Sequence, residues 1–349
     1  MSNEQLKKNN GFGCVLWGCG GCLVVTLIIT CLLVFAAMFF FSDSFEAETE
    51  HTSETVKIKT VSGFNRNSSQ YVAVIPVHGI IMNGDRYSDG VVTPEHFSTM
   101  MDKAEEDPNV RGVVISIDSP GGEVNAADAV YRRIRAFRSK TKLPVVALMG
   151  SVAASGGYYV AAACDQIVAG EMTLTGSIGV IISSYNFTGL LKKIGVEGEV
   201  YKSGEMKDML SPVKNRTEEE RKIVQSLVDE CYLSFARLVS RSRKMSLSKV
   251  MSAPIGDGRV YHGKTALSYG MVDQIGHLED AVALCAKLGN RKRGSLNVKR
   301  YNVSPGFFAE LFGVNGSLRN GLNLKVDLSG GNLPTVLKPG QLYFLPAGY

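Results

Sequence analysis

A serine within a run of small residues is the feature of this sequence with the clearest chemical potential. Ser155 lies in GSVAASGGYYVAAA at positions 150–163, directly before Gly156 and Gly157. The apolar run before it, 144–149, is typical of a strand, and the segment 158–164 is typical of a short helix. A serine at such a corner lies beside the N–H groups of a helix N-terminus, which favour negative charge. The pattern fits a serine nucleophile, and it fits a tight packing turn equally well.

A serine nucleophile needs a base, and the sequence offers both histidines and lysines. A lysine can act as a base when burial favours its neutral form. The segment YKSGEMKDMLSP at 201–212 contains Lys202 and Lys207, and the residue pattern does not choose between them. No histidine has a sequence context that marks it, although a Ser-His-Asp triad stays open; the five are His51, His78, His96, His262 and His277.

Donors for a developing oxyanion are easier to propose. The apolar run VRGVVISID at 110–118 is typical of a parallel strand buried on both faces, and SPGG at 119–122 ends it sharply. Ligands bind at the carboxyl ends of strands in open α/β sheets. The backbone N–H groups of Gly122 and Gly156 are therefore candidates to converge on one oxygen.

Alternating strand and helix patterns surround these segments and predict an α/β layered fold with crossover helices. Strand patterns occupy 71–81, 110–118, 144–149 and 165–169, and helical spacing occupies 94–107 and 125–138. A long amphipathic helix is predicted over 218–243, and the pattern resumes over 190–200. A last helix over 278–288 is expected to finish the compact unit.

The N-terminal region contains an uncharged apolar stretch at 15–41, longer than the roughly 20 residues needed to span a membrane. Lys7 and Lys8 precede it, which predicts a cytoplasmic N-terminus and an outward-facing body. A cleavable signal peptide is the competing interpretation, but its apolar region is usually shorter and ends in a small-x-small site. We therefore expect an uncleaved signal anchor, followed by a polar tether.

Composition excludes some function classes. The net charge of +5 is modest, and no long Lys/Arg run with interleaved aromatics occurs in the body, so nucleic-acid binding is not expected. Cys14, Cys19 and Cys22 have a loose metal-ligand spacing, but a membrane edge is a poor place for a zinc site. The three cysteines in the body are too far apart in sequence to imply a disulfide framework. A basic patch at 291–300 is expected to be a solvated surface, with contact to anionic lipid as the alternative.

Five motifs occur in an order that identifies a family, and they span about residues 71–288. They are SIDSPGGEV at 116–124, GSVAASGGYYVAAACDQIVA at 150–169, TLTGSIGV at 173–180, KSGEMKDMLSP at 202–212 and DGRVYHGKTALSYGMVD at 257–273. With these motifs the chain resembles the SppA-type signal peptide peptidases of peptidase family S49, in their short single-repeat form. The resemblance implies an α/β, Clp protease/crotonase-like layered fold. His262 departs from the small polar residue that such proteins often carry there.

The resemblance also implies a role for each site residue. Ser155 matches the nucleophile, and Lys207 matches the general base in preference to Lys202. Ser177 matches a serine that hydrogen-bonds and orients that lysine. The backbone of Gly122 and of Gly156 matches the oxyanion hole. No metal or other cofactor is implied.

The activity that the resemblance implies is that of a membrane-anchored serine endopeptidase with a Ser/Lys dyad, which degrades remnant signal peptides after precursor processing. The expected partners are signal peptides or other membrane-associated peptides, membrane lipid, and further copies of the chain in a homo-oligomeric ring. Serine and lysine can come from neighbouring subunits of such a ring. Short members can also bind or trim their own C-termini, and 342–346 resembles such a ligand.

The expected location is the bacterial inner or cytoplasmic membrane, crossed once. The alternatives are a crotonase-like acyl-CoA enzyme and a non-catalytic membrane-tethered assembly protein. The expected organisation is a cytoplasmic N-terminus at 1–13, a transmembrane signal anchor at 14–41, a tether at 42–70, an S49 peptidase domain at 71–288 and a C-terminal extension at 289–349.

Overall fold

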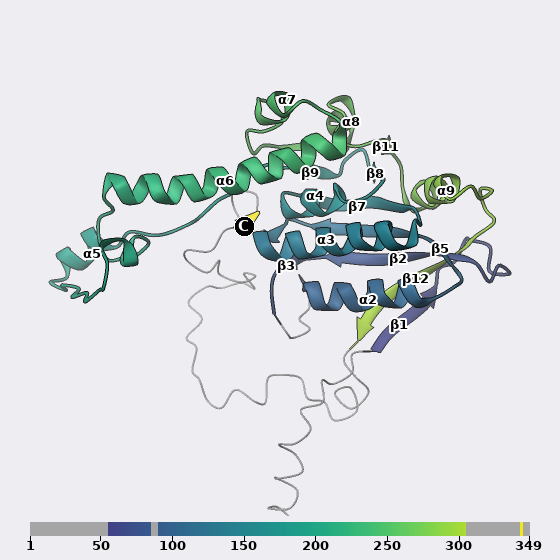
Figure 1. Cartoon of the computed structure of the whole chain (residues 1–349), viewed down its shortest axis with the longest axis horizontal. Coiled ribbons are helices and arrows are strands. Elements are labelled where there is room, and N and C mark those ends of the chain that lie inside the picture. The colour runs from purple at the N-terminus through teal and green to yellow at the C-terminus, as the bar shows by residue number, and fades with distance from the viewer. Residues whose placement is uncertain (1–54, 85–89, 305–342, 345–349) are drawn as a thin grey trace, which may run out of the picture. The chain divides into compact units, whose positions relative to one another are not determined.

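The computed structural model describes residues 55–84, 90–304 and 343–344, and these form one folded unit built on a mixed sheet (Figure 1). Most neighbouring strands of this sheet run parallel, whereas the β1–β12 and β9–β10 pairs are antiparallel. Its main strand order is β1 (Thr55–Thr60), β12 (Asn297–Ser304), β2 (Tyr71–His78), β5 (Val110–Ser119), β7 (Val145–Ala154), β8 (Gln166–Ala169) and β11 (Gln274–Ile275). The short strand β9 (Leu174–Gly176) pairs with β7, and β10 (Val260–His262) pairs with β9.

The central strands are buried on both faces because their sequences are apolar throughout. Alternate side chains of β2 enter two different cores: Tyr71, Ala73 and Ile75 face one, and Val72 and Val74 face the other. Helices α2 (Pro94–Glu106), α3 (Val124–Thr141) and α4 (Gly156–Ala161) cover the first face, and α9 (Leu278–Leu288) packs on the second. The crossover arrangement that the sequence predicts is therefore confirmed.

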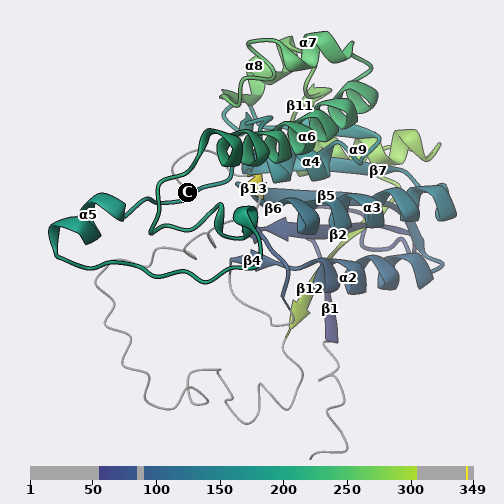
Figure 2. The same cartoon turned by 60° about the vertical axis from the view of Figure 1, so that its left-hand side comes forward.

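Helix α6 (Glu218–Arg243) connects the folded body to an outlying segment. A capping box between Thr217 and Glu220 starts the helix. Its C-terminal half is anchored to the body, where the Phe235 ring lies 5.1 Å from that of Tyr159. Its N-terminal half extends beyond the sheet, with α5 (Thr188–Lys193) and the 3₁₀ turn η1 (Glu205–Asp208) at that end (Figures 1 and 2). The short helices α7 (Leu247–Met251) and α8 (Gly263–Ser268) follow.

A second, smaller sheet lies at the carboxyl ends of the central strands. It has the order β13 (Tyr343–Phe344), β6 (Gly122–Glu123), β3 (Ile80–Ile81) and β4 (Val91–Val92). Strand β13 pairs antiparallel with β6, with Phe344 opposite Gly122. The C-terminal segment therefore reaches the strand that contains the expected oxyanion residue.

The folded unit begins earlier and ends later than the sequence predicts. Residues 55–60, expected in the tether, form β1, and residues 297–304, expected in the extension, form β12 between β1 and β2. Over 190–200 the chain forms only the end of α5. The expected membrane span at 14–41 lies outside the described residues, and within 55–84, 90–304 and 343–344 no helix is long and apolar enough to cross a membrane.

Candidate active site

Ser155 occupies the corner between β7 and α4, as the sequence predicts. Its backbone has φ 52° and ψ −113°, a region that a residue with a side chain rarely adopts. Two backbone hydrogen bonds hold this conformation: Ser155 N donates to Gly176 O at 2.8 Å, and Tyr159 N donates to Ser155 O at 2.8 Å. Such strain costs about 1–3 kcal/mol and is typical of active sites, including the strand-to-helix turns that present a nucleophilic serine.

The hydroxyl of Ser155 is buried without a hydrogen-bond partner in the part of the chain that the structure describes. The residue is fully buried, and its Oγ has no hydrogen-bond partner among the described residues. A buried hydroxyl without a partner costs about 1–3 kcal/mol, so native proteins retain few of them, often where catalysis requires it. The Oγ is thus not engaged by any other group of the described residues.

Hydrogen bonds from two tyrosines of α4 anchor the turn that carries Ser155. Tyr158 OH donates to Met271 O at 2.8 Å, and Tyr159 OH donates to Asp128 Oδ1 at 2.8 Å. Burial raises the pKa of both phenols, so they remain protonated donors. These two hydrogen bonds cannot be predicted from the sequence around Ser155, because Asp128 and Met271 are distant from it along the chain.

The two glycines expected to donate to an oxyanion lie at neighbouring elements. Gly156 is the first residue of α4, where an N–H has no partner inside the helix. A Cβ on Gly157 would lie 2.8 Å from Ser119 O, so α4 packs closely against the SPGG turn. Gly122 lies in β6, where a Cβ would meet Ile81 O at 1.8 Å. Only glycine fits that position, and it is buried at the end of the turn.

Ser177 lies beside the corner, directly after β9. Because Ala154 pairs with Gly176 and Ser155 N binds Gly176 O, Ser155 and Ser177 follow the ends of adjacent strands. Ser177 is 4% exposed, and its N–H donates to Arg259 O at 2.8 Å. The two serines predicted to share one site are therefore brought together.

A cleft of about 390 Å³ opens at Ser177. Three distant segments line it, and the sequence contains no signal that joins them: 177–181, the middle of α6, and the loop 256–258. Its lining includes both apolar and acidic side chains, among them Val180, Val228, Tyr232, Asp229 and Asp257. Asp257 is ion-paired with Arg259, so Asp229 is the acidic lining residue that is left to attract a cationic side chain.

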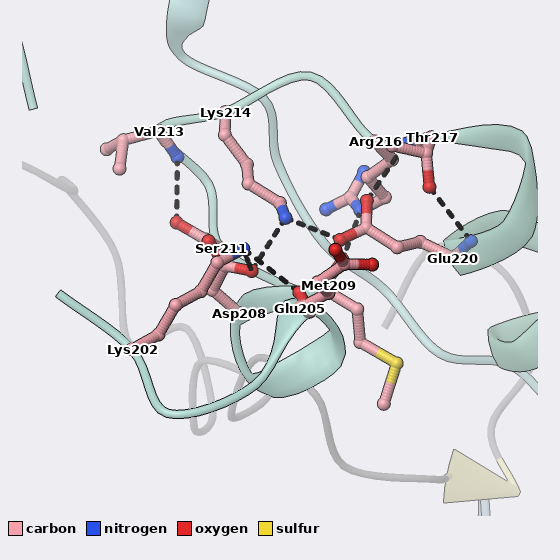
Figure 3. A network of polar contacts seen from close by, with 10 residues as sticks. All are labelled: Lys202, Glu205, Asp208, Met209, Ser211, Val213, Lys214, Arg216, Thr217 and Glu220. Carbon is pink, nitrogen blue, oxygen red and sulfur yellow. Dashed lines mark hydrogen bonds and ion pairs between the residues drawn. The ribbon is translucent and has the colours of Figure 1, made fainter. Parts of the chain in front are cut away.

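The two candidate lysines differ in their contacts. Lys202 Nζ donates to Asp208 Oδ1 at 2.7 Å and to Glu205 O at 2.9 Å (Figure 3). Lys207 lies in η1 and is exposed, and its side chain forms no hydrogen bond or ion pair with the described residues. Lys202 is thus held as an ion-paired ammonium, whereas Lys207 is free to contact another surface. No hydrogen bond joins Ser155 to Lys207 within this chain.

A histidine base for Ser155 has no support in the described residues, because the Ser155 Oγ bonds to none of them. His78 Nε2 instead lies 3.0 Å from Ser116 Oγ. Burial lowers the pKa of His78, against the opposing charge of Asp118. His262 Nδ1 is 3.4 Å from Met172 O, and its imidazole is exposed. Within the described chain, no group of three or more His, Cys, Asp or Glu side chains is placed to hold a metal ion.

Comparison with known families assigns the fold and the chemistry. The profile of peptidase family S49 matches residues 137–292, and that of the Clp protease family matches residues 69–177. Together these matches cover the strands and the corner that carry Ser155. The protein is a serine protease with an α/β, Clp protease-like fold.

Two named relatives agree with this class. "Putative signal peptide peptidase SppA" of Enterococcus faecium is 37% identical over 250 residues, which are 70% of this chain and 71% of the relative. "Protease 4" of Salmonella typhi is 34% identical over 65% of this chain and 36% of its own length. A solved ClpP1 mutant from Listeria monocytogenes covers 60% of this chain and 94% of its own, at 17% identity and a TM-score of 0.41. The chain belongs to peptidase family S49, which removes the acyl-CoA alternative.

Proposed function

We propose that the protein is a membrane-anchored endopeptidase in which Ser155 is the nucleophile and Lys207 the general base. The observation that carries this proposal is the buried Ser155 Oγ, which is held at a strained corner without a partner. Neutral Lys207 accepts the Ser155 proton as Oγ attacks the scissile carbonyl carbon, and then passes that proton to the leaving amine. Water, deprotonated by the same lysine, then hydrolyses the acyl-enzyme, and the proton returns to Ser155.

Backbone donors stabilise the tetrahedral intermediates in this proposal. The N–H of Gly156 begins α4, and the N–H of Gly122 lies on the neighbouring turn. Two such donors aimed at a developing oxyanion are worth several kcal/mol. Ser177, which lines the cleft, accepts a hydrogen bond from the incoming lysine in this proposal and orients it.

We assign Lys207 of each site to a neighbouring copy in a homo-oligomeric ring. In support, Lys207 is exposed on an outlying segment, and the segment around it leaves large apolar side chains uncovered. Tyr201 is 91% exposed, and the others are Tyr185, Phe187, Leu190, Ile194, Val196 and Val200. A monomer rarely exposes so many neighbouring apolar groups, whereas a subunit interface buries them. The acidic cleft at Ser177 offers charge complementarity to the lysine.

The substrates are remnant signal peptides or other membrane-associated peptides that bind in extended form. Edge pairing with β6 would align such a peptide along Gly122, since main-chain bonding to an exposed strand is a common mode of peptide recognition. In support, residues 343–344 of the chain itself pair with β6. We propose that the C-terminal segment is a self-ligand that pairs with β6 and is trimmed there. Intact mass measurement tests trimming: a full-length C-terminus in wild type and in Ser155→Ala alike contradicts it.

The apolar stretch at 14–41 is proposed as the anchor, which places the body outside the bacterial cytoplasmic membrane with the N-terminus in the cytoplasm. Membrane lipid is then the second partner. Cell fractionation tests this assignment. Recovery of the full-length chain in the soluble fraction contradicts it.

Hydrolysis of a purified signal peptide tests the dyad. Ser155→Ala and Lys207→Ala are each expected to lower kcat at least 1,000-fold, because a nucleophile and its base act as one unit. Lys222→Ala removes an exposed lysine of α6 and serves as the matched control, with activity within about twofold of wild type. Substantial hydrolysis by either dyad variant would falsify the assignment.

A further inference from the structure

A network of charges surrounds the residue next to Lys207. Asp208 Oδ1 accepts hydrogen bonds from Lys202 Nζ and from Lys214 Nζ, each at 2.7 Å (Figure 3). Lys214 also forms an ion pair with Glu220. The network thus contains two lysines and two carboxylates and has no net charge, with Lys207 outside it.

The network is fixed at both ends. The Glu220 side chain is 2% exposed, and its second oxygen accepts from Thr217 N at 2.8 Å in the capping box of α6. At the other end, Lys202 also donates to Glu205 O, within η1 itself. The carboxylate of Asp208 therefore has little freedom to reach any other cation.

The other charged groups of this segment leave the network intact. Arg216 donates to Met209 O at 3.2 Å and to Ser184 Oγ at 2.5 Å, both uncharged groups. Glu205 is exposed in the first position of η1. The cleft at Ser177 is lined by two acidic residues, Asp229 and Asp257, and the Asp257 carboxylate is already ion-paired with Arg259.

We infer that this network neutralises the carboxylate beside Lys207 and thereby keeps Lys207 able to work as a base near neutral pH. Asp208 directly follows Lys207 in η1, and an uncompensated carboxylate near an amine favours the ammonium form, which cannot accept a proton. Holding Asp208 between two lysines removes that bias. The inference rests on the proposed function, because it presupposes that Lys207 is the base.

The ionisation of the network agrees with its geometry. Hydrogen bonds from Lys202 and Lys214 lower the pKa of Asp208 to about 2. Hydrogen bonds to Asp208 and Glu220 raise the pKa of Lys214, and the hydrogen bond from Lys214 lowers that of Glu220. Asp208, Lys214 and Glu220 therefore stay charged near neutral pH.

The test is the pH profile of kcat/KM for a fluorogenic signal-peptide substrate at low ionic strength. Lys202→Met and Lys214→Met leave Asp208 under-compensated, so the pH of half-maximal activity on the acid limb rises by about half to one unit. Asp208→Asn leaves the charge of the lysines uncompensated, so the pH of half-maximal activity on the acid limb falls by a similar amount. Added salt shrinks both shifts.

A purely structural role predicts something else. If the network only anchored η1, all three variants would lower kcat without moving the pH of half-maximal activity, or would move it in one direction. The double variant Lys202→Met/Asp208→Asn restores charge balance and is expected to return that point to within about 0.2 units of wild type. Lys264→Met, which removes an exposed lysine of α8, is the charge control.

Shifts of opposite sign for the lysine and aspartate variants support the inference, and shifts of equal sign or no shift overturn it. Lys207→Ala separates this result from the dyad itself. If Lys207→Ala keeps its activity, the proposed function fails. If Lys207→Ala is inactive and the network variants leave the profile unmoved, only the present inference fails.

Discussion

Replacing Gly122 by alanine tests whether β6 delivers an oxyanion donor. The added Cβ would lie 1.8 Å from Ile81 O, whereas ordinary contact begins at 3.4 Å. Strands β3 and β6 must therefore part by about 1.6 Å, because the opposing atom is backbone and no side chain can turn away. A donor displaced by that distance no longer reaches the oxyanion.

The expected cost follows from that displacement. Loss of one oxyanion donor lowers kcat about 100- to 1,000-fold, and a 1 Å misplacement near the reacting atoms alone costs about 100-fold. We expect Gly122→Ala to lose kcat within that range. Stability falls less, by about 1–3 kcal/mol, because the strained contact is confined to the small sheet.

The assay compares kcat on a fluorogenic peptide with the midpoint of thermal unfolding. Gly84→Ala is the matched control, since a Cβ there meets nothing within 4 Å. It is expected to keep wild-type kcat. A folded Gly122→Ala protein with kcat within threefold of wild type would refute the oxyanion role of β6.

Three further predictions follow from the same geometry. Co-expressed Ser155→Ala and Lys207→Ala chains should regain about one quarter of wild-type activity, because random neighbours pair an intact serine with an intact lysine at that frequency; no recovery would show that each site uses its own lysine. His78→Asn should keep full activity in a kcat assay, because His78 bonds to Ser116 and not to Ser155. Arg243→Met should lower the free energy of unfolding by about 3 kcal/mol in urea titration, because it unpairs a largely buried bidentate partner of Asp273; a loss below 0.5 kcal/mol would contradict this.

The chemistry of the corner was predictable from residue types, but its partners were not. Small residues around Ser155 predict the strand-to-helix turn, since only they allow β7, α4 and the SPGG turn to pack so closely. Lys207 and Ser177 came from the family resemblance, because spacing along the chain does not tell an exposed lysine from a base. The burial of the Ser155 hydroxyl without a partner among the described residues is a property of the folded corner and leaves no trace in one stretch of sequence.

The C-terminal boundary of the folded unit is hard to predict from sequence, because its last long strand, β12, contains basic residues. Strand β12 mixes polar and apolar residues, with Lys299 and Arg300 in succession, so it does not resemble the apolar central strands. Its lysine is accommodated because Lys299 Nζ lies 4.0 Å above the Tyr71 ring, and β1 covers its outer edge. The periodicity of α6 predicted its length correctly, but Leu227 on its expected apolar face is 40% exposed. The residues that the structure describes leave part of that face uncovered.

The identity of the nucleophile is tested most directly by covalent labelling. A serine-reactive phosphonate is incubated with wild type and with Ser155→Ala, and intact mass and peptide mapping follow. We predict one adduct per wild-type chain, located at Ser155, and none on the variant. Equal labelling of both proteins, or an adduct mapped to another serine, contradicts the assignment of Ser155 as the nucleophile.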